Sequence, residues 1–162
     1  MAGDTACGKA ILNMQEYDPD FDIEDLTHEV EELTREFFCN YLSGNLEYID
    51  KVMGGPAHSF CKAMIELKVK EKWVYKLEEV IDVRLVDFRK GRVSDGRPHF
   101  TYHVVVEEYN LRVDAKTGED IVDSVTSDGS VQLATYEITL ARHSEPDIEL
   151  TGHYWELVQF EK

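Results

Sequence analysis

The sequence has few basic residues for its size. Lys and Arg number 17 against 33 Asp and Glu, so the formal net charge of the 162-residue chain is −16 at pH 7. Proteins that bind nucleic acid concentrate Lys and Arg along the phosphate path, and adhesion to anionic lipid also depends on basic residues. The scarcity of bases therefore argues against nucleic acid as a partner and makes direct lipid binding doubtful.

Long apolar segments are also missing. No stretch approaches the ~20 apolar residues that a membrane-spanning helix needs. The first ten residues have neither the apolar core of a secretory signal nor the Arg-rich composition of an organellar presequence. We therefore expect that the sequence is a mature or truncated chain, or that its targeting uses another route.

Cysteine is scarce. The three cysteines, Cys7, Cys39 and Cys61, form no CxxC pair, and an odd number does not suit a disulfide framework. We expect reduced thiols in a reducing compartment, with Cys39 and Cys61 packed as small hydrophobic residues.

Motifs for catalysis or cofactor binding are absent. The sequence has no GxSxG elbow, phosphate-binding glycine loop or dinucleotide fingerprint. His99 and His103 lie four residues apart in a predicted strand, where ~3.3 Å per residue separates them by roughly 13 Å, too far for a shared metal. We therefore predict no enzyme activity, no cofactor and no metal site.

What the chain does have is material for a core. Hydrophobic residues make up 43% and aromatic residues 10% of the sequence, which is too many for a disordered acidic chain. The length suits one domain. We predict a short N-terminal extension or helix over residues 1–14 and a single domain over residues 15–162.

The first third of the sequence has helical periodicity. Asp22 is a good N-cap for a long helix, whose apolar residues recur every three or four positions up to Tyr41, and Ser43-Gly44 is a typical stop. Pro56 suits the first turn of a later helix. The predicted helices cover Asp4–Gln15, Asp22 to Ser43, Leu46–Val52 and Pro56 to Glu71.

Strand patterns follow Glu71. Turns are predicted at residues 89–91, 94–96 and 114–118, and loops at residues 126–129 and 144–152. Phe100, Tyr102, Val104 and Val106 are expected on one face of a strand, and Ala134 to Leu140 also alternates. The predicted strands cover Trp73–Phe88 with a break at residues 77–80, His99–Arg112, Val131–Arg142 and Tyr154–Phe160. Helices followed by strands predict an α+β domain in which the helices pack on one face of a curved antiparallel sheet of about four strands.

The charge is distributed in three blocks. Residues 1–50 carry a net charge of −11, residues 51–98 carry +4, and residues 99–162 carry −9. A helix face solvated by water and a docking patch for an acidic partner are equally good interpretations of the basic block. The candidate partner-binding residues are Lys62, Lys68, Lys70, Lys72 and Lys76. The acidic helix from Asp22 to Tyr41 is another candidate surface, for a basic partner.

A curved sheet backed by helices can also contain an apolar pocket. The residues that we expect to line it are Met64, Tyr102, Tyr136 and Trp155. Ordinary core packing is the competing interpretation of these four side chains.

The order of several motifs resembles a known family. The segment YDPDFDIEDL (17–26), the helix end SGNL (43–46), the strand YEITLAR (136–142) and the closing WEL (155–157) occur in this order. They resemble the C-terminal domain of the mitochondrial Tim44 subunit, over roughly Gln15 to Phe160. The resemblance implies a cystatin-like α+β fold with a large apolar pocket on the concave side of the sheet.

The resemblance also implies a function. The main member of the family is a peripheral, non-enzymatic scaffold on the matrix face of the mitochondrial inner membrane, where it recruits the matrix heat-shock chaperone to the presequence translocase. Translocase components and the chaperone are thus the expected partners. The alternative is an accessory subunit of a large inner-membrane assembly such as a respiratory complex. A mitochondrial ribosomal subunit and a small-ligand carrier are weaker alternatives.

Overall fold

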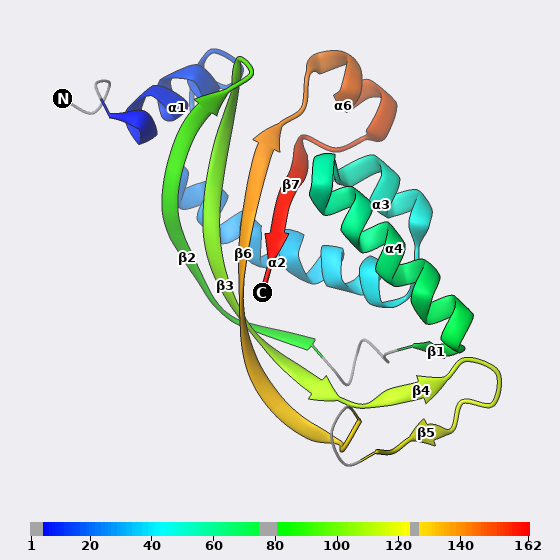
Figure 1. Ribbon diagram of the computed structural model, residues 1–162. Coiled ribbons are helices and arrows are strands. Elements are labelled where there is room, and N and C mark those ends of the chain that lie inside the picture. Colours follow the sequence, from blue (N-terminus) through cyan, green and yellow to red (C-terminus); the bar gives the residue numbers. More distant parts are fainter. Residues whose placement is uncertain (1–4, 75–80, 124–126) are drawn as a thin grey trace.

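The computed structural model describes residues 5–74, 81–123 and 127–162. Helices lie against one face and one edge of a curved antiparallel sheet (Figure 1), and this α+β architecture confirms the predicted fold class. The helices are α1 (Ala6–Gln15), α2 (Ile23–Leu42), α3 (Leu46–Val52), α4 (Gly55–Glu71) and α6 (Glu145–Thr151).

The predicted signals for the helix ends are confirmed. The Asp22 carboxylate accepts a hydrogen bond of 2.8 Å from the backbone N–H of Glu24, which satisfies a free donor in the first turn of α2. Gly44 follows this helix at φ +77°, a conformation that glycine adopts without strain. Pro56 lies in the first turn of α4, where its missing N–H costs nothing.

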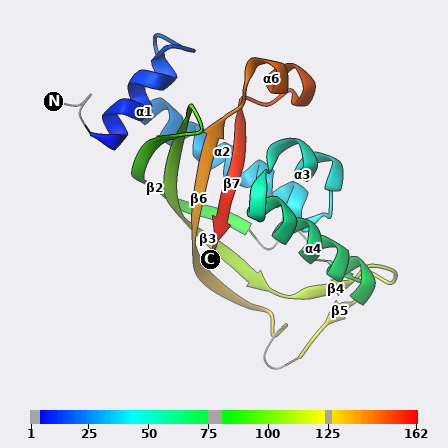
Figure 2. The ribbon, with the colours of Figure 1, turned by 45° about the horizontal axis from the view of Figure 1, so that its top comes forward.

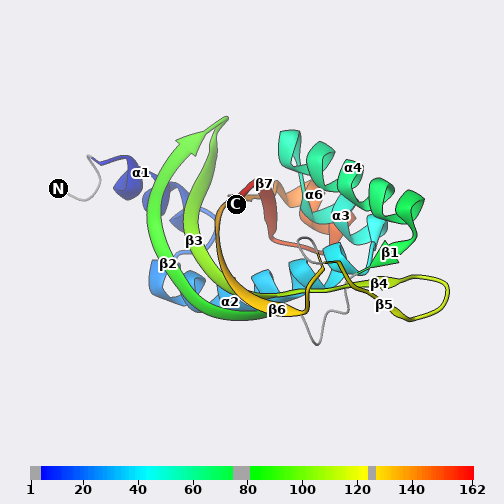
Figure 3. The same ribbon diagram turned by 60° about the horizontal axis from the view of Figure 1, so that its bottom comes forward.

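Four strands form the main sheet in the order β2-β3-β6-β7, and every neighbouring pair is antiparallel. A smaller antiparallel sheet has the order β1-β4-β5. Figure 3 shows the curvature of the main sheet from the end at which β4 and β5 lie. The strands are β1 (Trp73–Val74), β2 (Ile81–Ser94), β3 (Arg97–Asn110), β4 (Arg112–Asp114), β5 (Asp120–Ile121), β6 (Ser130–Arg142) and β7 (Trp155–Glu161).

The hairpin between β2 and β3 confirms one predicted turn and corrects another. Asp95 and Gly96 both have positive φ, 53° and 72°, as a two-residue turn between twisted strands requires. The turn expected at residues 89–91 is wrong, because β2 continues through this segment with a register shift between Phe88 and Lys90. Gly91 serves close packing instead: a Cβ there would lie 3.1 Å from the ring of Phe100.

The structure refines two strand predictions. The segment from Trp73 to Phe88, predicted with a break at residues 77–80, contributes β1 to the small sheet and the start of β2 to the main sheet, and the break itself lies outside the described residues. The long strand expected to end at Arg112 is interrupted at Leu111, beyond which β4 pairs with β1 and β5.

The segment from Ser144 to Gly152, expected as a loop, forms α6. The Ser144 hydroxyl accepts a hydrogen bond from the backbone N–H of Asp147, Pro146 lies in the first turn, and Gly152 ends the helix at φ +75°. These are complete start and stop signals. The helix was missed because α6 has no buried residue and therefore no apolar periodicity.

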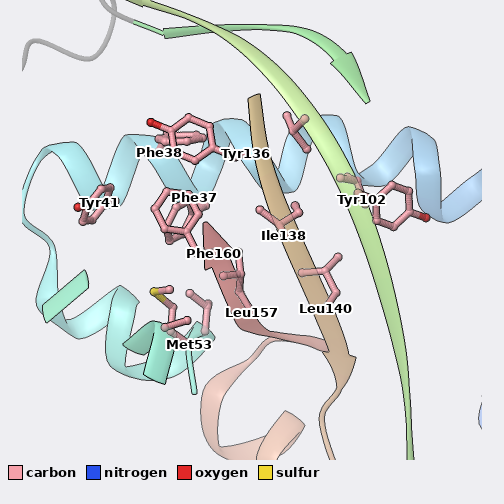
Figure 4. Close-up of a cluster of buried hydrophobic side chains, with 14 of the residues drawn as sticks. Phe37, Phe38, Tyr41, Met53, Tyr102, Tyr136, Ile138, Leu140, Leu157 and Phe160 are labelled. Atoms are coloured by element: carbon pink, nitrogen blue, oxygen red, sulfur yellow. The ribbon is translucent and has the colours of Figure 1, made fainter. Parts of the chain in front are cut away.

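The core lies between the helices and the inner face of the sheet. Phe100, Tyr102, Val104 and Val106 of β3 are fully buried, as the alternation predicted. Figure 4 shows aromatic side chains of α2 meeting those of β6 and β7, including Phe37, Phe38, Tyr136 and Phe160.

Three of the helices lie at opposite edges of the main sheet, α1 at one edge and α3 and α4 at the other. Figures 1 and 2 show α1 beside β2, and α3 and α4 along the β7 edge. Ala10 and Met14 of α1 belong to the same buried cluster as α2 and the sheet. The domain boundary at residues 14 and 15 remains a prediction.

Candidate functional site

A cavity of about 240 Å³ lies between α4, the C-terminal half of α2 and the inner face of the sheet. We call it the aromatic cavity. Its walls come from α2, α4, β1, β3 and β6 and from Lys162. They include Phe38 and Tyr41 of α2, Met64 and Lys68 of α4, Glu108 of β3 and Tyr136 of β6.

Secondary-structure periodicity brings these side chains together. Met64 and Lys68 are four residues apart on α4 and therefore share a face of the helix. Tyr136 belongs to the alternating buried set of β6, so it faces the helices and not the outer side of the sheet. In Figure 4 the rings of Phe38 and Tyr136 lie side by side, and their centroids are 5.2 Å apart.

Lys68 is the buried cation of the aromatic cavity, with 6% of its surface exposed. Its Nζ lies 4.8 Å from the ring centroid of Tyr41 and 5.4 Å from that of Trp73, distances at which an ammonium group is attracted to an aromatic face. Burial lowers the pKa of Lys68 to about 8, against the opposing effects of Cys61 and Glu108. The side chain is thus largely but not completely protonated at neutral pH.

Glu108 is held by two neighbours at the cavity wall. The Tyr136 hydroxyl donates a hydrogen bond to Oε1 of Glu108, and Nζ of Lys162 lies 3.0 Å from Oε2. Both carboxylate oxygens are therefore engaged by the protein itself.

The structure brings together two of the four residues expected to line a pocket. Met64 and Tyr136 both line the aromatic cavity. Tyr102 is fully buried elsewhere in the core, where its hydroxyl lies 3.1 Å from Oγ1 of Thr27, and burial raises its pKa to about 12. Trp155 packs near Phe100, with ring centroids 6.0 Å apart.

The predicted basic strip is divided among different faces of α4. At about 100° per residue, Lys68 is about 120° from Lys62 and about 160° from Lys70 around the helix. Lys68 is buried, Lys62 is half-buried and Lys70 is exposed. Lys72 is exposed and caps α4 in a left-handed conformation with φ 60°. Lys76 lies outside the described residues.

Some residues of the aromatic cavity are not predictable from the sequence. Tyr41, Trp73 and Glu108 were not expected there, because they come from separate elements and no motif joins them. Lys68 was assigned to the surface strip, although its spacing of four from Met64 was a signal that both share a face.

The exposed side of α2 has a different character. Four of its acidic side chains, which we call the acidic stripe, fall within about 60° of the helix circumference. All four are exposed. The acidic stripe consists of Asp25, Glu29, Glu32 and Glu36. The one basic residue of the helix, Arg35, contacts Glu31 and Glu32 at 2.9 Å each.

Residues 5–74, 81–123 and 127–162 contain no group of three or more His, Cys, Asp or Glu side chains placed to hold a metal ion. No helix in the same part of the chain combines the length and apolarity that crossing a bilayer requires. His99, considered above as a ligand, donates a 3.0 Å hydrogen bond from Nδ1 to the Arg97 carbonyl, and Nε2 of His103 lies 3.3 Å from Oε1 of Glu137.

Comparisons with known proteins agree with this architecture. The chain is similar in structure to the intermembrane-space region of the chloroplast protein ARC6, with a TM-score of 0.54 and 11% sequence identity over 88% of this chain and 97% of that one. This likeness shows a shared fold. No curated protein sequence matches the chain. The sequence profile of the Tim44-like domain matches residues 7–162. The chain therefore belongs to the Tim44-like domain family.

Proposed function

We infer that the protein is a non-enzymatic scaffold at the matrix face of the mitochondrial inner membrane, where it links the presequence translocase to the matrix heat-shock chaperone. The observation that carries this proposal is the family match, which extends over essentially the whole chain.

The chemistry of the aromatic cavity supports a binding role over a catalytic one. A general base must be able to accept a proton from a substrate within hydrogen-bonding distance. The carboxylate of Glu108 is already engaged by Tyr136 and Lys162. Lys68 is packed between the rings of Tyr41 and Trp73, which attract its charged form.

The acidic stripe is the surface that best fits a protein partner. Acidic side chains arranged in a row strengthen the negative electrostatic potential around them, and this potential steers a basic partner toward the surface. None of the four side chains is buried, so all are accessible along the outer side of α2. The partner of this surface would be a segment rich in Lys or Arg.

The exposed lysines near the C-terminal end of α4 are second candidates, for an acidic partner, although they do not share one face of the helix. Lys70 and Lys72 are exposed, and Lys62 is half-buried. Reversal of Lys70 and Lys72 tests these candidates. Lys68 is left out of that test, because a Glu at its buried position would unfold the site around it.

Affinity purification from mitochondria tests the proposed scaffold. The proposal predicts recovery of translocase subunits and the matrix heat-shock chaperone in stoichiometric amounts with the tagged chain. Stoichiometric recovery of respiratory subunits without either of these partners would contradict it and would indicate an accessory subunit of a respiratory assembly.

A pair of charge-matched variants then locates the surface. Glu29→Lys with Glu36→Lys reverses half of the acidic stripe and should reduce partner recovery at least fivefold. Glu119→Lys with Glu149→Lys makes the same change of net charge at two exposed positions outside α2 and should leave recovery unchanged. Equal losses for both variants would show that overall charge, and not the acidic stripe, determines binding.

A further inference from the structure

The aromatic cavity differs in charge from the rest of the protein. The whole chain has a net charge of −16. Of the described residues that line the cavity, however, two are cationic, Lys68 and Lys162, and one is anionic, Glu108. A cavity with a positive excess in a strongly acidic protein favours an anionic occupant over a cationic one.

The position of Lys68 concentrates this charge at the wall of the cavity. Its ammonium group lies against the rings of Tyr41 and Trp73, both of which also line the cavity. Burial in such surroundings strengthens the attraction between this cation and an anion that enters, since little water screens it. The depressed pKa of Lys68 agrees with its removal from water.

The other walls are suited to an apolar group. Phe38, Leu42 and Met64 contribute hydrocarbon and aromatic surface, and the Tyr136 ring adds a flat face. The volume of about 240 Å³ is below the range of roughly 300–1,000 Å³ for pockets that hold drug-sized ligands. An occupant must therefore be small, with one short apolar chain or one ring.

We propose that the aromatic cavity binds a small soluble monocarboxylate, with its carboxylate at Lys68 and its apolar part between Phe38, Met64 and Tyr136. The carboxylate meets a desolvated ammonium group, and the short chain displaces water from an apolar surface. Both contributions are needed, so a neutral molecule of the same length binds more weakly. This inference does not depend on the proposed scaffold function.

Tryptophan fluorescence of the full chain provides the measurement. The protein has two tryptophans. Trp73 lines the aromatic cavity and Trp155 does not. The Trp155→Phe variant therefore reports on the cavity alone. Octanoate should change its emission in a saturable way, and octan-1-ol, which has the same chain length and no charge, should bind at least fivefold more weakly.

Substitution of the lysine tests its role. In the Trp155→Phe background, Lys68→Met should weaken octanoate binding at least fivefold and leave octan-1-ol binding unchanged. Lys62→Met, on another face of α4, should change neither. Lys68→Arg, which keeps the charge, should retain the preference for octanoate, and it provides a folded comparison if Lys68→Met does not fold.

The pH dependence gives an independent readout that needs no substitution at Lys68. The charged or titratable groups that line the cavity with Lys68 are Tyr41 on α2, Glu108 and Tyr109 on β3, Tyr136 on β6, and Lys162, and Cys61 on α4 also acts on Lys68. With a pKa of about 8, the protonated fraction of Lys68 falls from about nine-tenths at pH 7 to about one-tenth at pH 9. Octanoate affinity should fall roughly tenfold over this interval, and octan-1-ol affinity should not.

Vesicles distinguish a free carboxylate from the headgroup of a lipid. Phosphatidylglycerol vesicles should neither bind the protein nor change the Trp73 emission. A change with vesicles and none with octanoate would overturn the proposal in favour of a lipid. Equal affinity for octanoate and octan-1-ol, or no saturable signal with either, would also overturn it.

Discussion

The rings of Tyr136 and Phe160 stack face to face, with their centroids 4.9 Å apart and their planes 9° from parallel. Tyr136 also lines the aromatic cavity, while Phe160 contacts Phe37 at a ring distance of 5.0 Å. The stack thus connects the cavity wall on β6 to the core beneath α2. The shape of the cavity depends on this packing.

Removal of the Phe160 ring should destabilise the protein strongly. Phe160→Ala leaves a cavity beside Tyr136 and Phe37 and should lower the free energy of unfolding by about 3–5 kcal/mol. Urea denaturation measures the change. As a control, Phe60→Ala, at a position that is 53% exposed, should cost less than about 1 kcal/mol. Similar losses for the two variants would contradict the placement of the core.

A methyl group at Gly91 should also be unfavourable. The Cβ of Gly91→Ala would lie 3.1 Å from the Phe100 ring and 3.4 Å from Ala10, so the expected loss of stability is about 1–3 kcal/mol. Phe100→Leu makes room at the same point. The double variant should therefore lose less stability than the sum of the two single variants. Strict additivity would show that Gly91 and Phe100 do not pack together.

Periodicity made much of the fold predictable from the sequence. The apolar residues of α2 and the alternation in β3 and β6 mark faces that must be buried, whichever elements cover them. The predictions of a turn at residues 89–91 and of a loop at residues 144–152 were wrong, because the local sequence signals there have other structural roles. Gly91 permits close packing and not a turn, and α6 begins and ends by its caps without a buried face.

The candidate site was harder to predict than the fold. Lys68 was read as one of several surface lysines, because sequence spacing does not show which side of a helix is covered. Its burial against Tyr41 and Trp73 depends on elements 27 residues before it and 5 residues after it in the sequence. Such contacts follow from tertiary packing and leave no local motif.

The two cysteines expected to pack as small hydrophobic residues should differ in reactivity. Cys61 is fully buried, and burial raises the pKa of its thiol to about 12, whereas Cys39 is exposed. Because the thiolate is the reactive form, iodoacetamide at pH 8 should modify Cys39 in the folded protein and Cys61 only after unfolding. Peptide mass spectrometry measures both sites. Equal labelling of the two in the folded state would contradict the burial of Cys61.

His143 should make stability depend on pH. The ring is 3% exposed, and its Nδ1 lies 4.0 Å from Oε2 of Glu156. Burial lowers the pKa of His143, with Glu156 and Asp147 acting in the opposite direction and Arg97 in the same one. A depressed folded-state pKa favours the neutral ring, so its contribution is present above the unfolded pKa of about 6.5 and is lost as pH falls below it.

Comparison of two variants isolates this effect. Urea denaturation of the protein should show a loss of stability between pH 7.5 and pH 5.5 that is smaller in His143→Gln. His28→Gln, which changes an exposed histidine on α2, should leave the pH dependence as it is in the unmodified chain. An unchanged pH dependence in His143→Gln would show that His143 is not responsible.

The most direct test of the proposed scaffold function is the native size of the assembly that contains the protein. Mitochondria are solubilised in digitonin and separated by blue native electrophoresis, and mass spectrometry then follows the chain along the gel. We expect the chain to migrate together with presequence translocase subunits, and Glu29→Lys with Glu36→Lys to release it. Migration as a free 18.7 kDa chain, or together with a respiratory complex, would contradict the proposed scaffold function.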